Sequence, residues 1–151
     1  MPLNNFNPKY QGVQKDHLKK RILKFKKLIE AMSDHEISES VLKSINAEIE
    51  KANQAQSESE LAKQLQKSYR NILKIVEKEL NLVAKDHYRN MWMALGMTVF
   101  GIPFGVVFGA ALNNYAFIGI GLPIGFAIGI AIGSKKDTEA QEQRRQLNIE
   151  V

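Results

Sequence analysis

Gly101-Ile-Pro-Phe-Gly-Val-Val-Phe-Gly-Ala-Ala111 is followed, twenty residues along the chain, by Gly121-Leu-Pro-Ile-Gly-Phe-Ala-Ile-Gly-Ile-Ala131. The three glycines and the proline of each stretch coincide at this offset. Nine of the ten glycines in the chain lie between Gly96 and Gly133, and no charged residue occurs from Met91 to Ser134. An uncharged apolar region of this length is typical of helices that lie in lipid. Its regularly spaced glycines favour close contact between such helices.

This apolar region, residues 91–133, divides into two predicted membrane-spanning helices over residues 91–112 and 116–133. At 1.5 Å per residue they reach about 33 and 27 Å, close to the roughly 30 Å thickness of a hydrocarbon core. Residues 113–115, Asn-Asn-Tyr, form the polar turn between them. A soluble helical hairpin is the remote alternative, because glycine at every fourth position of a soluble helix costs roughly 1 kcal/mol per residue relative to alanine.

Glycines spaced by four residues lie on one face of each predicted span, where backbones can approach closely. The predicted helix-packing residues are Gly101, Gly105 and Gly109 in the first span and Gly121, Gly125, Gly129 and Gly133 in the second. An antiparallel hairpin centred on Tyr115 places Gly109 opposite Gly121 and Gly105 opposite Gly125. The pattern leaves open whether the stripes pack within one hairpin or between subunits of a homo-oligomer.

Pro103 and Pro123 occupy equivalent positions and are predicted to kink the spans. Proline has no backbone N–H and disturbs the bond to the carbonyl four residues back. The spans contain no Asp, Glu, Lys, Arg or His, which argues against a proton relay or a charged selectivity ring. A pore built from them would be apolar or lined by backbone.

Basic residues flank the two spans and are absent from the turn. Lys85 and Arg89 precede the first span, and Lys135 and Lys136 follow the second. The positive-inside rule therefore predicts a multi-pass protein of the inner (cytoplasmic) membrane with both termini in the cytoplasm. The absence of a signal-peptide core after Met1 agrees with this orientation. The predicted interface aromatics are Tyr88, Trp92 and Tyr115.

The polar, Lys-rich part of the chain is predicted to be helical. Residues 1–12, with two prolines, are expected to form an extended lead-in, residues 13–90 a cytoplasmic helical or coiled-coil domain, and residues 134–151 a cytoplasmic tail. Apolar residues from Leu18 onward recur in heptad-like steps. The overall prediction is an all-α fold, in which a two-span transmembrane hairpin with glycine-zipper stripes follows an N-terminal helical domain.

Two capping boxes, Ser33-x-x-Glu36 and Ser57-x-x-Glu60, predict where a second and a third helix begin. The polar residues between them leave open whether these two helices are separate or fused. No glycine or proline follows before Gly96. We therefore expect the third helix to continue into the membrane as one long helix.

The net charge of +5 is unevenly distributed. Residues 1–29 carry eight basic residues and one acid, whereas residues 30–60 carry two basic and eight acidic residues. The basic face of the first helix consists of Lys15, Lys19, Lys20, Arg21, Lys24, Lys26 and Lys27. Its expected partner is either the acidic second helix of the same chain or the anionic membrane surface. Nucleic acid is not expected, because no reading motif is present.

No residue pattern indicates catalysis. The chain has no cysteine, and His17, His35 and His87 lie far apart without metal-ligand spacing. The glycines lie in the apolar region and form no phosphate-binding loop. We predict a protein that is not an enzyme and has no metal or other cofactor.

The glycine repeat and the C-terminal residues together resemble a known family. Residues 101–105, 117–125 and 129–133, followed by Arg145-Gln-Leu-Asn-Ile-Glu150, are similar to small uncharacterised bacterial membrane proteins of the glycine-zipper family. The resemblance covers about residues 88–151. It implies a membrane topology and no particular activity.

The sequence thus predicts a small, non-enzymatic membrane protein that self-associates through its glycine stripes. In this hypothesis it acts as a membrane-anchored helical scaffold or adaptor, and residues 13–90 bind a cytoplasmic protein partner. The alternative is an oligomeric membrane pore or channel formed by a ring of hairpins.

Overall fold

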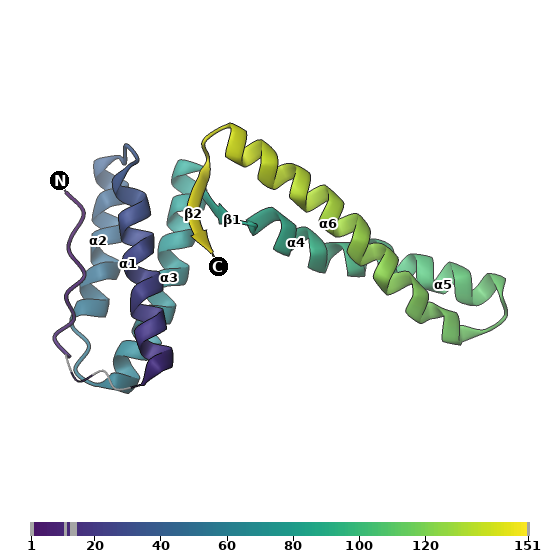
Figure 1. Ribbon diagram of the computed structural model, residues 1–151, viewed down its shortest axis with the longest axis horizontal. Helices are drawn as coiled ribbons and strands as arrows, with labels where there is room; N and C mark the ends of the chain where they lie inside the picture. Colours follow the sequence, from purple (N-terminus) through teal and green to yellow (C-terminus); the bar gives the residue numbers. More distant parts are fainter. Residues whose placement is uncertain (1, 11, 13–14, 151) are drawn as a thin grey trace. The chain divides into compact units, whose positions relative to one another are not determined.

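The computed structural model describes residues 2–10, 12 and 15–150, which are mostly helical (Figure 1). This confirms the helical prediction, although two short strands are also present. The chain forms two compact units. The first comprises the residues up to Val83 together with Leu147–Ile149, and the second comprises Ala84–Gln146 together with Glu150.

Three helices build the first unit: α1 (Asp16–Ser33), α2 (Glu39–Asn53) and α3 (Glu58–Leu80). The question of fused helices is therefore answered, since α2 and α3 are separate. Their heptad-like apolar positions form the core, because residues at these steps share one helix face. The fully buried members include Leu18, Phe25, Met32, Ile45, Ile49, Leu65 and Ile72.

One of the two predicted capping boxes is correct. Ser57 precedes α3, its hydroxyl accepts a 3.2 Å hydrogen bond from the Glu60 N–H, and the Glu60 carboxylate accepts one of 2.9 Å from the Gln56 N–H. The box at Ser33 is wrong. Ser33 is the last residue of α1 and donates its hydroxyl to the Ile29 carbonyl, and α2 begins only at Glu39.

The expected continuous helix from α3 into the apolar region is also wrong. α3 ends at Leu80 because Asn81 takes the left-handed conformation (φ 54°) and its N–H donates to the Glu77 carbonyl, as in an αL C-cap. Asp86 is left-handed too (φ 59°), so the next helix starts only at His87. Asn and Asp adopt this conformation more easily than other residues with a side chain.

Two asparagines of α2 hold the extended N-terminal residues. The Asn46 carboxamide accepts from the Asn4 N–H (2.8 Å) and donates to the Pro2 carbonyl (3.1 Å). Asn53, two helical turns later, repeats this arrangement with the Asn7 N–H (2.8 Å) and the Asn5 carbonyl (3.1 Å). These side chains of α2 thus hold the backbone of the lead-in along the helix.

The buried carboxylate of Glu48 joins α2 to α3. It accepts hydrogen bonds from Lys51 (2.6 Å) and Asn71 (3.2 Å), and Ser68 donates to its backbone carbonyl. Burial by itself raises the pKa of Glu48, but these bonds and the Lys51 charge outweigh burial and lower the pKa below its ordinary value of 4.5. Glu48 is therefore charged at neutral pH and paired.

The last residues of the chain are not a separate tail. Residues 134–142 form the end of α6 (Ile118–Glu142), and the left-handed Arg144 (φ 54°) then ends the helical course. The strand β2 (Gln146–Glu150) pairs with β1 (Val83–Lys85) in a two-stranded sheet. Leu147 and Ile149 are buried within the first unit, whereas Asn148 is exposed.

The second unit is a helical hairpin (Figure 1). Its first arm consists of α4 (His87–Gly96), one π-helical turn (Met97–Gly101) and α5 (Ile102–Ala111), and α6 is its second arm. A short turn over Tyr115–Phe117 leads into α6. Both arms are long and apolar enough to cross a membrane: His87–Ala111 has 25 residues and Tyr115–Glu142 has 28.

Candidate functional site

Glycine occupies the buried positions of the apolar hairpin. Between Met91 and Gly133, the buried residues are all glycines, and the larger side chains are exposed or partly exposed. The outward residues include Val99, Ile102, Val107 and Leu112, each at least half exposed. The buried glycines are Gly96, Gly101, Gly105, Gly109, Gly121, Gly125, Gly129 and Gly133. All seven glycines singled out in the sequence are among them.

The two arms approach backbone against backbone. A Cβ atom added at Gly96, Gly105, Gly121, Gly125, Gly129 or Gly133 would lie less than 3.0 Å from backbone atoms of the facing arm. Gly119 differs, because a Cβ there would meet nothing within 4 Å. Only a residue without a side chain permits such proximity. The glycines therefore form the close contact between the two arms of one chain.

The register of the hairpin differs from that expected for a centre at Tyr115. Gly121 lies against Gly101 and Gly105, and Gly125 against Gly96 and Gly101, which places the centre near Leu112. The shift arises because the turn begins early. Asn113 is left-handed (φ 48°), and the Asn114 N–H bonds back to the Gly109 carbonyl at 3.0 Å. Asn114 also accepts from the Ala116 N–H and starts the next turn.

A wide turn aligns Gly96, which the sequence reasoning missed, with the rest of the glycine face. Gly96 precedes Gly101 by five residues, a spacing that turns away from the face of a regular α-helix. The π-helical turn contains the bond from the Ile102 N–H to the Met97 carbonyl and so accommodates the extra residue. It ends two residues before Pro103, one of the two predicted kinks. Pro123 lies inside α6, which continues past it.

A buried carboxylate continues the glycine face of α6. Asp137 follows Gly133 by four residues and is 7% exposed. Its two oxygens accept hydrogen bonds from the backbone N–H groups of Tyr88 (3.0 Å) and Arg89 (2.8 Å) in the first turn of α4. Asp137 therefore acts as the N-terminal cap that the Asp86 side chain does not supply. Because Asp137 continues the four-residue spacing of the glycines, its position on the contact face could have been predicted from the sequence.

We expect Asp137→Ala to fray the start of α4. The substitution leaves two N–H groups at a helix N-terminus without their anionic acceptor, a loss of about 1–2 kcal/mol. Hydrogen exchange at the amides of Tyr88 and Arg89 should accelerate by about tenfold in the full chain. Glu139→Ala, at an exposed position of the same helix, is the control. Equal exchange rates in both variants would contradict the capping role.

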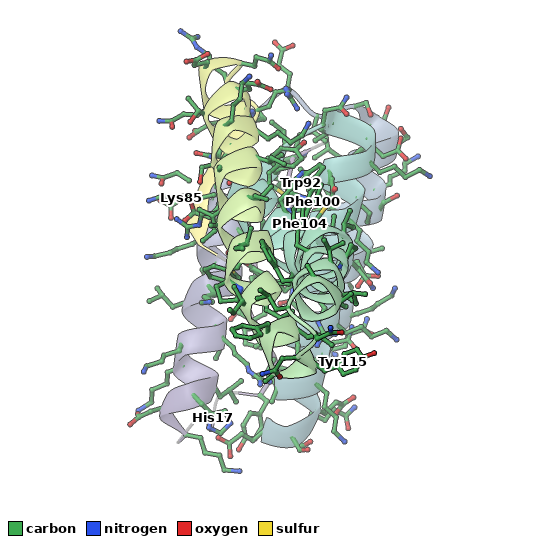
Figure 2. The ribbon with its side chains drawn as sticks, turned by 90° about the vertical axis from the view of Figure 1, so that its right-hand side faces the viewer. His17, Lys85, Trp92, Phe100, Phe104 and Tyr115 are labelled. Carbon is green, nitrogen blue, oxygen red and sulfur yellow. The ribbon has the colours of Figure 1, made fainter. Side chains whose placement is uncertain are left out.

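The three aromatics predicted at membrane interfaces differ in exposure. Trp92 is partly buried, and the Lys136 ammonium lies 5.9 Å from its ring centroid. Tyr88 is also partly buried and stacks edge-on against His87, with centroids 5.1 Å apart. Tyr115, at the turn, is 79% exposed (Figure 2). Residues at both ends of the hairpin thus carry the amphipathic rings that favour a lipid–water boundary.

The basic face of α1 is exposed and does not pair with α2. All seven of its residues are exposed. Among the described residues, its ion pairs join Lys15 to Glu58 of α3 (3.9 Å) and Lys19 to Asp16 of α1 itself (3.3 Å). Arg21 donates to the Ala62 carbonyl of α3. These basic residues therefore do not form the predicted ion pairs with the acidic second helix, α2.

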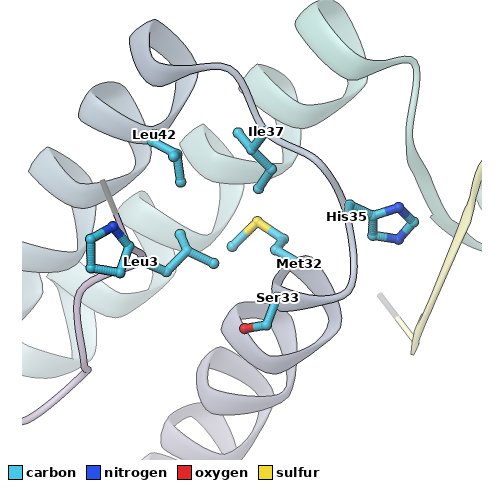
Figure 3. A pocket seen from close by; sticks show the side chains of 7 residues that line it. Leu3, Met32, Ser33, His35, Ile37 and Leu42 are labelled. Atoms are coloured by element: carbon cyan, nitrogen blue, oxygen red, sulfur yellow. The ribbon is translucent and has the colours of Figure 1, made fainter.

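No arrangement typical of catalysis is found in the described part of the chain. None of the described residues form a group of three or more His, Cys, Asp or Glu that could hold a metal. His17 lies on α1, His35 in the following loop and His87 at the start of α4. One pocket of about 460 Å³ lies between the N-terminal segment and the α1–α2 loop. Its apolar side chains face one another, and His35 points away from them (Figure 3).

Comparisons with known proteins provide no family for this chain, since no protein-family model, curated protein or solved structure matches it.

Proposed function

We propose that the protein is a small membrane-anchored helical scaffold, in which the hairpin lies in the bilayer and the three-helix unit binds a partner outside it. The observation that carries the proposal is the inverted surface of the hairpin. Its interior is glycine and its exterior is apolar, whereas a soluble helical protein buries its large apolar residues.

The exposure of the two arms supports lipid as the surrounding solvent. Only 22% of the most apolar stretch of each arm is buried inside the protein. Phe104 and Phe126 are about 40% exposed. Exposed apolar patches of this extent mark membrane or protein interaction sites. At 1.5 Å per residue the arms reach about 37 and 42 Å, enough to cross a hydrocarbon core of about 30 Å.

The flanking charges support the orientation, with both connections to the hairpin in the cytoplasm and the Asn113–Tyr115 turn on the far side of the inner membrane. This proposal agrees with the resemblance to glycine-zipper membrane proteins. It does not require self-association through the glycine faces, which already have a contact partner within the chain. We favour the anchor over a pore for the same reason, because a ring of hairpins would have to assemble through the larger outward side chains.

Single cysteines test both insertion and orientation, because the chain has none of its own. In sealed cells we expect Asn113→Cys to react with an impermeant maleimide, and Asn148→Cys to react only after the inner membrane is opened. The protein should also remain in the membrane after alkaline extraction. Release by alkali, or equal labelling of both positions in sealed cells, would rule out the proposed topology.

A further inference from the structure

A second basic surface lies on α3 and is not part of the run on α1. Lys63, Lys67, Arg70 and Lys74 follow one another at steps of four, three and four residues. At 100° per residue these positions fall within roughly 60° of one another around the helix axis. With Gln66 and Asn71 they line an open depression of about 300 Å³. The four cations therefore share one surface, which we call the α3 basic groove.

Little negative charge opposes the groove. Its lining contains no carboxylate. Asn71 bonds to the Glu48 carboxylate, but that group is already paired with Lys51 at 2.6 Å. Glu60, three residues before Lys63, and Glu77, three residues after Lys74, are the acids of α3 at the two ends of this face, and the Glu60 carboxylate already accepts a hydrogen bond from the Gln56 N–H. Among the described residues, the four groove cations form no ion pair with protein carboxylates, so their charges face solvent.

The position of α3 in the chain limits which anions it meets. Only Ala84, Lys85 and Asp86 separate the first unit from the start of α4, a reach of roughly 10 Å. If α4 begins a membrane span, this short connection keeps the first unit near the head groups. This step rests on the proposed function. A cationic groove held there meets phosphate groups of the bilayer at high local concentration.

We propose that the α3 basic groove binds the phosphate-bearing head groups of anionic lipids. Lysine ammonium groups act as point charges toward phosphate, and Arg70 can bind it in a bidentate manner. Gln66 and Asn71 supply amide groups beside the cations. The groove thus binds the three-helix unit to the membrane surface, in addition to the covalent tether.

The experiment uses the full chain in lipid nanodiscs, with an environment-sensitive dye on Gln66→Cys as the only thiol. Adding phosphatidylglycerol to phosphatidylcholine discs should shift the dye emission. Lys67→Gln with Arg70→Gln should weaken the phosphatidylglycerol-dependent binding that the dye reports roughly 25-fold, since each cation near an anionic surface changes partition about fivefold. Lys24→Gln with Lys27→Gln, which removes two exposed cations of α1, is the matched control and should retain the response.

Salt provides a second measurement that does not depend on the folding of a charge variant. At about 1 M salt the Debye length falls to roughly 3 Å, and the phosphatidylglycerol response of the labelled protein with all four groove cations intact should disappear reversibly. The proposal is overturned if phosphatidylglycerol does not change the dye emission, or if both double variants lose the response equally. A dye that responds to RNA or inorganic phosphate but not to the lipid also overturns it.

Flotation separates this inference from the proposed function. If the protein floats with pure phosphatidylcholine vesicles and resists alkali, yet gives no lipid-dependent dye response, the membrane anchor is supported and the lipid-binding groove is contradicted. If it floats only with anionic vesicles and is released by salt, the membrane anchor is contradicted and the lipid-binding groove is supported.

Discussion

We expect Gly125→Leu to separate the two arms of the hairpin. A Cβ at this position would lie 2.5 Å from the Gly101 nitrogen and 2.7 Å from its Cα, and the Gly96 carbonyl oxygen is also in contact. Overpacking costs about 1–3 kcal/mol where side chains can adjust. Here the opposing atoms are backbone, so that whole helices must move. The loss should reach or exceed the upper end of that range.

The measurement is the unfolding of the full chain in mixed micelles as the fraction of denaturing detergent rises, followed by helicity. Gly119→Leu is the matched control, because it adds the same side chain to the same helix where a Cβ meets nothing within 4 Å. Both substitutions exchange the same pair of residues within α6. If both shift the transition equally, the glycine face has no special role, and the effect is one of propensity or lipid partition.

The same pair of variants bears on whether the stripes also serve between subunits. If Gly125→Leu changes only the unfolding transition, the glycines act within the chain. If it also changes the mass of the particle in detergent while Gly119→Leu does not, the oligomer predicted from the sequence depends on that face. The two readouts are independent, because one follows helix content and the other follows particle mass.

The glycine spacing was sufficient to predict the hairpin and most of its contact face, because a step of four is a property of any α-helix. The register was not predictable in the same way. It depends on where Asn113 and Asn114 end one helix and start the next. Moving the centre by about three residues changes each facing pair by about six, which places Gly121 between Gly101 and Gly105 and still keeps the two glycine stripes in contact. Gly96 was hidden for a related reason, since its step of five matches the face only once a π-helical turn is present.

The boundary between the two units was missed because local composition favours helix there. Residues 81–86, Asn-Leu-Val-Ala-Lys-Asp, contain no glycine or proline. The break depends on two single residues, Asn81 and Asp86, that adopt left-handed conformations. Tertiary contacts decide such positions, since Leu82, Val83 and Ala84 are all buried. The α3 basic groove, by contrast, could have been read from its spacing alone.

The C-terminal strand contributes to the core of the first unit, and its removal should have a large effect. Leu147 is 1% exposed and Ile149 is 5% exposed, and the two alternate with the exposed Asn148 as expected for a strand with one buried face. Replacing a buried Leu or Ile with Ala costs about 2–5 kcal/mol. We therefore expect Leu147→Ala with Ile149→Ala to destabilise α1, α2 and α3, although these helices lie more than sixty residues earlier in the sequence.

Hydrogen exchange in the full chain measures this effect helix by helix. The buried amides of α1, α2 and α3 should exchange at least tenfold faster in the double variant, and Asn148→Ala should leave them unchanged. Unchanged protection in the double variant would show that the three helices keep their core without the strand.

The buried strand also decides how a soluble fragment of the first unit should be designed. A fragment that ends at residue 90 lacks both apolar residues, whereas one in which a short linker replaces residues 87–143 keeps them. Only the second fragment retains the complete core, because the chain enters the hairpin after Val83 and returns to the first unit at Leu147.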